Sequence, residues 1–191
     1  MAPIKNKSLR DQELVNLLIR YRILTNTAIQ RTLMPSQSMN AVTKVTARLC
    51  KSGILNRYPL LPPQHYFVAG KKLTLQRGWS IRKTKPLGPQ ALPTELAVLV
   101  YSTGIATNVR RLLPSEIKSC MPWLPEDLGK AIYCIGANGV LQLVVVDLGG
   151  SPRHISQKAQ KVIDARLEVP QLEEMAKAER LLLTVLTTSN E

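Results

Sequence analysis

The chain has 191 residues, and its 26 Lys and Arg against 13 Asp and Glu give a formal net charge of +13. Hydrophobic residues make up 45% of the sequence, which is enough to build a core and excludes a wholly disordered basic tail. The apolar runs are far shorter than the roughly 20 residues of a membrane-spanning helix. Residues 1–5 do not lead into a signal peptide. We therefore expect a soluble, cytoplasmic protein without a membrane partner.

The cysteines Cys50, Cys120 and Cys134 lie far apart in the sequence, and the chain has two histidines, His65 and His154. Such spacing fits neither a disulfide framework nor a zinc module. We expect no bound metal of that kind.

The positive charge is concentrated in the first half of the chain. Residues 1–88 hold 16 Lys and Arg and 2 acidic residues, a net charge of +14, whereas residues 89–191 hold 10 and 11, a net charge of −1. Proline and glycine in residues 83–89 indicate a linker. We therefore predict two domains, residues 1–85 and 90–191, and expect the first to bind a polyanion.

Three helices are predicted in the basic half. Apolar residues recur with helical spacing over residues 8–24. Polar residues 25–27 can cap a short helix over residues 28–34, which Pro35 ends. A third helix is predicted over residues 39–52. Its expected inward positions are Met39, Val42, Val45 and Leu49.

Two strand-like segments follow, residues 54–58 and 65–69. Three helices and a β-ribbon are the order of a winged helix-turn-helix, in which the exposed face of the third helix reads base edges in the major groove. We expect His65 to pack or to contact phosphate rather than to catalyse. The predicted DNA-binding residues are Arg31, Asn40, Thr43, Lys44, Arg48, Lys51, Arg57, Lys71 and Lys72.

The second half alternates helical and strand patterns. Residues 136–139 form a hairpin turn of the Asn-Gly type, and residues 140–147 are apolar on both faces, which predicts a central strand covered by helices. The other predicted elements are helices over residues 92–101, 155–167 and 171–180 and a final strand over residues 181–187. This half is predicted to be a small α/β domain, so that the whole chain is α+β.

Asp127, Asp147 and Lys158 are the candidate catalytic residues. Acidic residues before one hairpin strand and at the end of the next, with a lysine beyond, are the elements of a restriction-endonuclease-like site that holds Mg²⁺ near a scissile phosphate.

The order of these segments resembles the replication-relaxation proteins, which include the MobC-type plasmid relaxases. The resemblance rests on residues 125–127 (Pro-Glu-Asp), 145–149 (Val-Val-Asp-Leu-Gly) and 183–187 (Leu-Thr-Val-Leu-Thr), and it spans roughly residues 10 to 188. It implies a winged helix followed by a nuclease-like domain that acts on DNA.

In that family the strand ends in Glu-x-Asp-x-Gly. Carried over, Asp127 matches the first acid, Asp147 and Gly149 match the later part, and Lys158 matches the lysine, but Val145 stands where the glutamate is expected. Losing this carboxylate removes a metal ligand, so we expect a nuclease-like scaffold without nuclease activity and without a cofactor.

The sequence thus favours a double-stranded DNA-binding protein of plasmid or mobile-element type, a regulator or accessory factor in DNA transfer or replication. Two alternatives stay open. In the first, the chain is a Mg²⁺-dependent nicking enzyme that uses Asp127, Asp147 and Lys158, with Glu126 replacing the missing acid. In the second, the chain is a protein-interaction module whose basic face binds an acidic partner. Self-association and contacts with other DNA-processing proteins are open in each case.

Overall fold

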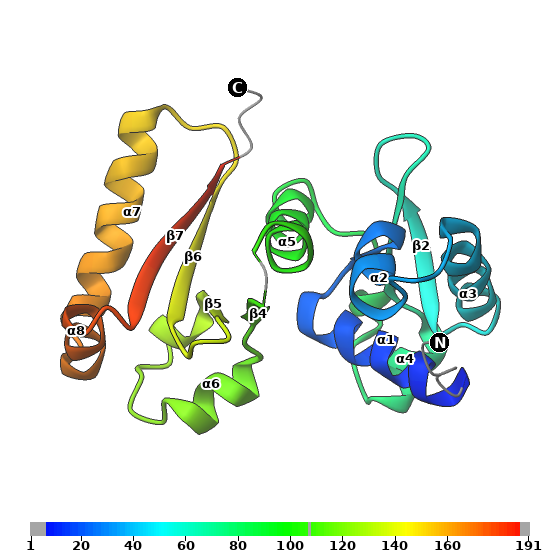
Figure 1. Ribbon diagram of the computed structural model, residues 1–191, viewed down its shortest axis with the longest axis horizontal. Coiled ribbons are helices and arrows are strands. Elements are labelled where there is room, and N and C mark those ends of the chain that lie inside the picture. Colours follow the sequence, from blue (N-terminus) through cyan, green and yellow to red (C-terminus); the bar gives the residue numbers. More distant parts are fainter. Residues whose placement is uncertain (1–6, 107, 188–191) are drawn as a thin grey trace. The chain divides into compact units, whose positions relative to one another are not determined.

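The computed structural model describes residues 7–106 and 108–187 and shows a mixed α+β chain, as predicted. It divides into two compact units, Met1–Gly104 and Ile105–Glu191 (Figure 1). Within the described residues, no helix is long and apolar enough to cross a membrane.

The first unit combines helices with a small antiparallel sheet. Its elements are α1 (Lys7–Tyr21), β1 (Leu24–Thr25), α2 (Asn26–Leu33), α3 (Met39–Lys51), β2 (Leu55–Pro59), β3 (His65–Ala69), α4 (Lys71–Gln76), η1 (Ile81–Thr84), α5 (Ala91–Val100) and η2 (Tyr101–Ile105). The strand order is β1-β3-β2, with Leu24 opposite Phe67 and Tyr58 opposite Tyr66. The sequence pattern indicated neither β1 nor α4.

Side-chain caps start α2 and α3; α3 begins at residue 39, as predicted, whereas α2 begins at Asn26, two residues before the predicted start. The Thr25 hydroxyl accepts a hydrogen bond from the Ala28 amide at 3.1 Å, and the Ser38 hydroxyl accepts one from the Ala41 amide at 3.3 Å. Gly53, with φ +74°, follows the end of α3 in the left-handed conformation that glycine adopts without strain. The caps fix the length of α3 and hence which side chains it carries.

The buried side of α3 differs from the prediction at one end. Val42, Val45 and Leu49 point inward, as expected, together with Thr46, whereas Met39 is 39% exposed. Met39 is the first residue of the helix, which begins before the chain reaches the core. The core of this unit gathers around α3 from Leu14, Leu18, Ile23, Leu24, Ile29, Leu55 and Phe67, each at most 2% exposed.

The first unit extends to Gly104, past the segment at which the sequence places the boundary. Glu95 of α5 is 4% exposed and accepts a hydrogen bond from Arg22, just after α1, at 2.6 Å. Residues 83–89 are also held by the hairpin β2–β3, because Tyr58 donates to the Thr84 carbonyl at 2.7 Å. Contacts at Thr84 and Leu87 thus attach this Pro- and Gly-containing segment to the hairpin.

The second unit is a four-stranded sheet with helices. Its elements are β4 (Arg110–Arg111), α6 (Pro114–Cys120), η3 (Leu128–Lys130), β5 (Ile132–Ile135), β6 (Leu141–Asp147), α7 (Pro152–Leu167), α8 (Pro170–Lys177) and β7 (Leu181–Thr187). The strand order is β4-β5-β6-β7; β6 pairs antiparallel with β5 and parallel with β7. The predicted hairpin, central strand β6 and final strand β7 are all present. The core of this unit includes Leu112, Ile117, Met121, Tyr133, Leu141, Leu143, Leu172 and Leu181.

The Ser38 cap makes α3 sensitive to a single hydroxyl. Ser38→Ala removes the acceptor for the Ala41 amide, and loss of such a cap costs about 1 kcal/mol, which corresponds to roughly five-fold faster exchange of α3 amide hydrogens. Hydrogen-exchange mass spectrometry of peptides covering residues 39–51 measures this. Ser36→Ala, an equal change at an exposed turn residue, is the control, and equal exchange in the two variants would contradict the capping role.

Candidate nucleic-acid interface

Helix α3 presents a polar and basic side to solvent. Burial of Val42, Val45 and Leu49 turns the opposite side of the helix outward. We call that side the α3 outer face, and it consists of the exposed residues Asn40, Thr43, Lys44, Ala47 and Lys51. Asn40, Thr43, Lys44 and Lys51 are among the residues predicted to contact DNA, and the fold brings them together on one surface.

A groove runs between α3 and the hairpin β2–β3. We call it the α3–hairpin groove, and its lining residues are Asn26, Thr43, Thr46, Ala47, Cys50, Arg57, Pro63, His65 and Phe67. Figure 1 shows α3 beside β2, which carries Arg57 into this region. The groove therefore continues the α3 outer face through the shared residues Thr43 and Ala47.

Asn26 organises the polar wall of this groove. Its amide group donates to the Thr43 hydroxyl at 3.3 Å and accepts from the Thr46 hydroxyl at 3.2 Å. These bonds tie the start of α2 to the middle of α3. Sequence reasoning treated Asn26 only as a capping residue, because the pairing joins positions that are 17 and 20 residues apart.

One side of the hairpin faces α3 and carries the groove residues as well as the buried Phe67, and the other side faces residues 84–87. Arg57 lies opposite Phe67, and Pro59 lies opposite His65, so that these four residues share one side of the ribbon. Their neighbours point the other way, where Tyr66 accepts from the Leu87 amide at 3.2 Å. Arg57 and His65 are exposed on the groove side, which fits contact with an anion.

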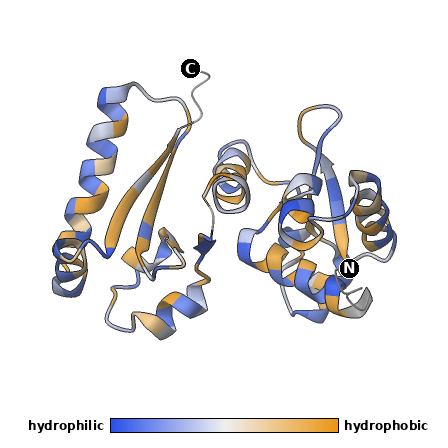
Figure 2. Ribbon diagram, in the orientation of Figure 1, coloured by the Kyte–Doolittle hydropathy of each residue, from blue (hydrophilic) through white to orange (hydrophobic). Residues whose placement is uncertain are grey.

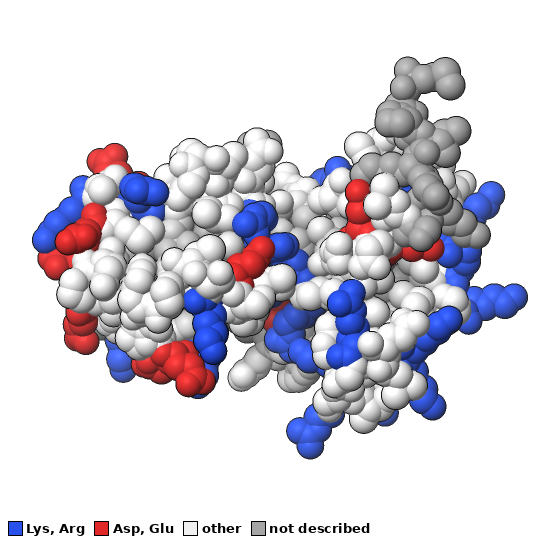
Figure 3. All heavy atoms as spheres, turned by 90° about the horizontal axis from the view of Figure 1, so that it is seen from below, with Lys and Arg blue, Asp and Glu red and all other residues white. Residues whose placement is uncertain are grey.

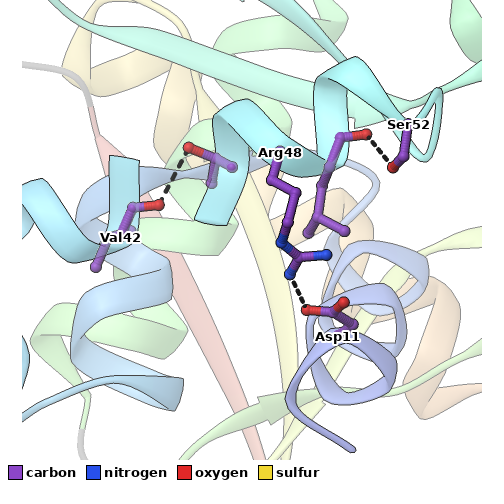
Figure 4. Close-up of polar contacts among 6 residues, drawn as sticks. Asp11, Val42, Arg48 and Ser52 are labelled. Atoms are coloured by element: carbon purple, nitrogen blue, oxygen red, sulfur yellow. Dashed lines mark hydrogen bonds and ion pairs between the residues drawn. The ribbon is translucent and has the colours of Figure 1, made fainter. Parts of the chain in front are cut away.

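Arg48, which the prediction groups with Lys44 and Lys51, lies at the border of the α3 outer face and is half-buried there. Figure 4 shows its guanidinium turned toward α1, where Nη2 donates to Asp11 Oδ1 at 2.6 Å. This hydrogen bond raises the pKa of Arg48 above its usual value. Arg48 is four residues after Lys44, and the helix rotation of about 100° per residue places it only about 40° further round α3. What separates Arg48 from Lys44 is therefore its ion pair with α1 and not the rotation of the helix.

The other predicted cations occupy two different places. Lys71 and Lys72 are exposed at the start of α4, and the Lys72 amide donates to the Gly53 carbonyl at 2.9 Å, which holds this helix start against the end of α3. Arg31 is exposed on α2, and its guanidinium lies against Gly104. Lys71 and Lys72 therefore adjoin α3, whereas the contact of Arg31 is with the end of the unit.

The electrostatics of the two units differ strongly. Residues 1–104 hold 16 Lys and Arg against 3 Asp and Glu, a net charge of +13, and residues 105–191 hold ten of each. Figure 3 shows one side of the molecule, on which most charged side chains of the first unit are basic, while both signs are mixed over the second. The whole net charge of the chain thus resides on the unit that carries α3.

The carboxylate of Asp147 stabilises the turn after β6. It is 6% exposed and accepts hydrogen bonds from the Gly149 amide at 3.1 Å and the Gly150 amide at 3.0 Å. Lys158 of α7 donates to the Val146 carbonyl at 3.2 Å, so that this predicted residue does lie beside the end of β6. Asp127 is exposed at the start of η3.

These residues lack one carboxylate of the Mg²⁺ site that the family resemblance implies. Val145, at the position of the missing glutamate, is buried and offers no oxygen, and Asp147 already accepts bonds from two backbone amides. Among the residues that the structure describes, no group of three or more His, Cys, Asp or Glu is arranged to hold a metal ion.

Comparison with known proteins found no relative of this chain. No family model matches the chain, and neither the curated proteins nor the solved structures contain a match.

Proposed function

We propose that the first unit is a winged helix-turn-helix domain that binds double-stranded DNA. One observation carries the proposal: the exposed polar side of a capped helix and a groove beside it lie on the unit that holds the net charge of +13. The element order α1-β1-α2-α3-β2-β3 and the strand order β1-β3-β2 support it, since a helix triplet followed by a β-ribbon is typical of this domain class.

In this proposal α3 enters the major groove, which is about 12 Å wide and admits one helix. Asn40, Thr43 and Lys44 occupy the first half of α3, the part of a recognition helix that contacts base edges. An asparagine pairs with adenine and a lysine with guanine in the usual major-groove contacts. These three residues are therefore the proposed determinants of sequence preference.

The remaining cations hold the phosphate backbone. Lys51 at the end of α3, Lys71 and Lys72 at the start of α4 and Arg57 on the hairpin flank the outer face. Phosphate contacts supply most of the affinity and set the register of the protein on the duplex without reading sequence. His65 joins this group from the groove, in the role expected from its place at the start of a strand.

The aromatic residues favour duplex over single-stranded nucleic acid. Tyr66 and Phe67 are 2% exposed, and Tyr58 is half-buried and packs on Tyr66 with ring centres 5.8 Å apart. Single-strand binding depends on exposed rings on which bases stack. The rings of the hairpin are committed to the interior of the unit instead.

For the second unit we propose a scaffold role rather than phosphodiester cleavage. Its Asp147 and Lys158 hold backbone groups at the junction of β6 and α7. The resemblance to replication-relaxation proteins suggests the biological setting, a regulator or accessory factor in plasmid transfer or replication. A nicking assay on supercoiled plasmid with Mg²⁺ or Mn²⁺ tests this part, because relaxed product that disappears in Asp147→Ala would overturn it.

The salt dependence of binding tests the proposed backbone contacts. Lys51→Ala removes one phosphate contact, so the negative slope of log affinity against log salt concentration becomes shallower by about 0.9. Fluorescence anisotropy with a mixed-sequence duplex at several salt concentrations measures the slope. Lys161→Ala, which removes an equally exposed lysine from α7, is the control, and equal slopes in the two variants would argue against an interface at α3.

The ion pair with Asp11 predicts that Arg48 and Lys44 differ in DNA binding. Lys44→Ala weakens binding more than Arg48→Ala, because Arg48 is already paired. The same ion pair also contributes to stability: we expect a coupling free energy of unfolding between Asp11 and Arg48 of about 0.2–1 kcal/mol, the usual range for a partly exposed pair. Titrations with duplex and urea unfolding of the double-mutant cycle measure both effects. A larger loss of affinity from Arg48→Ala would restore Arg48 to the interface.

Cys50 provides a footprint of the groove. Burial raises the pKa of the Cys50 thiol, an effect that Arg57 partly offsets, so alkylation is slower at Cys50 than at the exposed Cys120. We expect bound duplex to slow the alkylation of Cys50 further and to leave the alkylation rate of Cys120, in the second unit, unchanged. Mass spectrometry after N-ethylmaleimide treatment at pH 8.5 measures both rates. Unchanged Cys50 alkylation under saturating duplex would exclude the groove from the interface.

A further inference from the structure

Strand β7 forms an edge of the sheet in the second unit. It pairs with β6 on one side over Leu181 to Thr187, and within the described residues no strand pairs with its other side. The burial of the two strands differs accordingly. Six of the seven residues of β6 are buried, whereas in β7 only Leu181 is, and Leu182 is 47% exposed.

This edge lacks the features with which proteins prevent strand association. The sequence Leu-Leu-Leu-Thr-Val-Leu-Thr contains no charged residue, no proline and no glycine. Figure 2 shows β7 as a hydrophobic strand beside the equally hydrophobic β6. Edge strands of monomeric proteins are usually short, charged or interrupted, because their free N–H and C=O groups can pair with another chain.

The direction of the free backbone groups follows from the ladder with β6. The Leu141 amide donates to the Arg180 carbonyl at 2.9 Å, so the carbonyl of Arg180 points toward β6. Backbone groups alternate in direction along a strand. Leu182, Thr184 and Leu186 therefore direct theirs to β6, and the groups of Leu181, Leu183, Val185 and Thr187 point outward.

We propose that a second copy of this chain occupies the edge, with the two β7 strands paired antiparallel about a two-fold axis at Thr184. Centring the pair at Thr184 overlaps all seven residues. Leu183 then exchanges both backbone hydrogen bonds with Val185 of the second copy. The outward groups identified above are the ones that this register requires. On the more exposed side of the sheet, Leu182 lies opposite Leu186 of the second copy.

Charge favours a second copy at this edge. Residues 105–191 hold ten basic and ten acidic residues, so two second units meet without net repulsion, whereas two first units carry +13 each. A two-fold pair also closes, because each copy has used its only free β7 edge. The interface includes no residue of the α3 outer face or of the α3–hairpin groove and does not depend on the proposed function.

Substitutions of Thr184 by residues of opposite charge test the register. In the symmetric pair the two Thr184 side chains lie opposite each other, and like charges in that position disfavour pairing. Analytical ultracentrifugation of the full chain should show a dimer for the unaltered protein and monomers for Thr184→Lys and for Thr184→Glu. An equimolar mixture of the two variants should restore the dimer. Circular dichroism of each variant checks that the fold is kept.

A measurement on the unaltered chain covers the case in which the variants do not fold. Hydrogen exchange in residues 181–187 should slow with rising protein concentration, since the outward amides become bonded in the dimer, while exchange in residues 39–51 stays constant. A monomer at all concentrations would overturn the proposal. So would aggregates without a defined dimer, or a dimer that persists in both Thr184 variants.

Discussion

The burial of one side of α3 is the constraint on which the candidate interface depends. Val42, Val45 and Leu49 are each at most 7% exposed, and moving any of them into water would lose the apolar contacts of a close-packed core. The helix can therefore rotate little about its axis. Its opposite side, with Asn40, Lys44 and Lys51, is presented to solvent as a consequence of packing rather than of any interaction among the polar residues themselves.

Two of the few acidic residues of the first unit form ion pairs with arginines at the junctions between helices. Asp11 pairs with Arg48 between α1 and α3, and Glu95 pairs with Arg22 between α5 and the end of α1. Both carboxylates lie at helix junctions, where an arginine would otherwise be partly desolvated without a counter-charge. The cations that remain exposed on α3, α4 and the hairpin retain their positive field, which is the condition for attracting a polyanion.

The second unit uses similar chemistry for a different purpose. Asp147 is buried at the end of a hydrophobic strand, a costly position for a carboxylate unless hydrogen bonds satisfy it. Two glycine amides do so, and Lys158 satisfies the adjacent carbonyl. What resembles part of a metal site in the sequence serves in the fold to turn the chain from β6 into α7. The hydrophobic edge of β7 is a feature that the contacts of the described residues within this unit do not account for.

The sequence by itself determined the α+β class, the three helices and hairpin of the first unit, and the hairpin and last strand of the second, because local signals specify them. Apolar spacing, capping hydroxyls and turn glycines act over a few residues. It also determined which half of the chain carries the charge. Only the tertiary structure decided that α5 belongs to the first unit, that Arg48 turns to Asp11, and that Asn26 braces α3, since these contacts join residues 17 to 73 positions apart. One helix turn separates Lys44 from Arg48, and which of them meets solvent depends on where α1 packs, information that no local pattern contains.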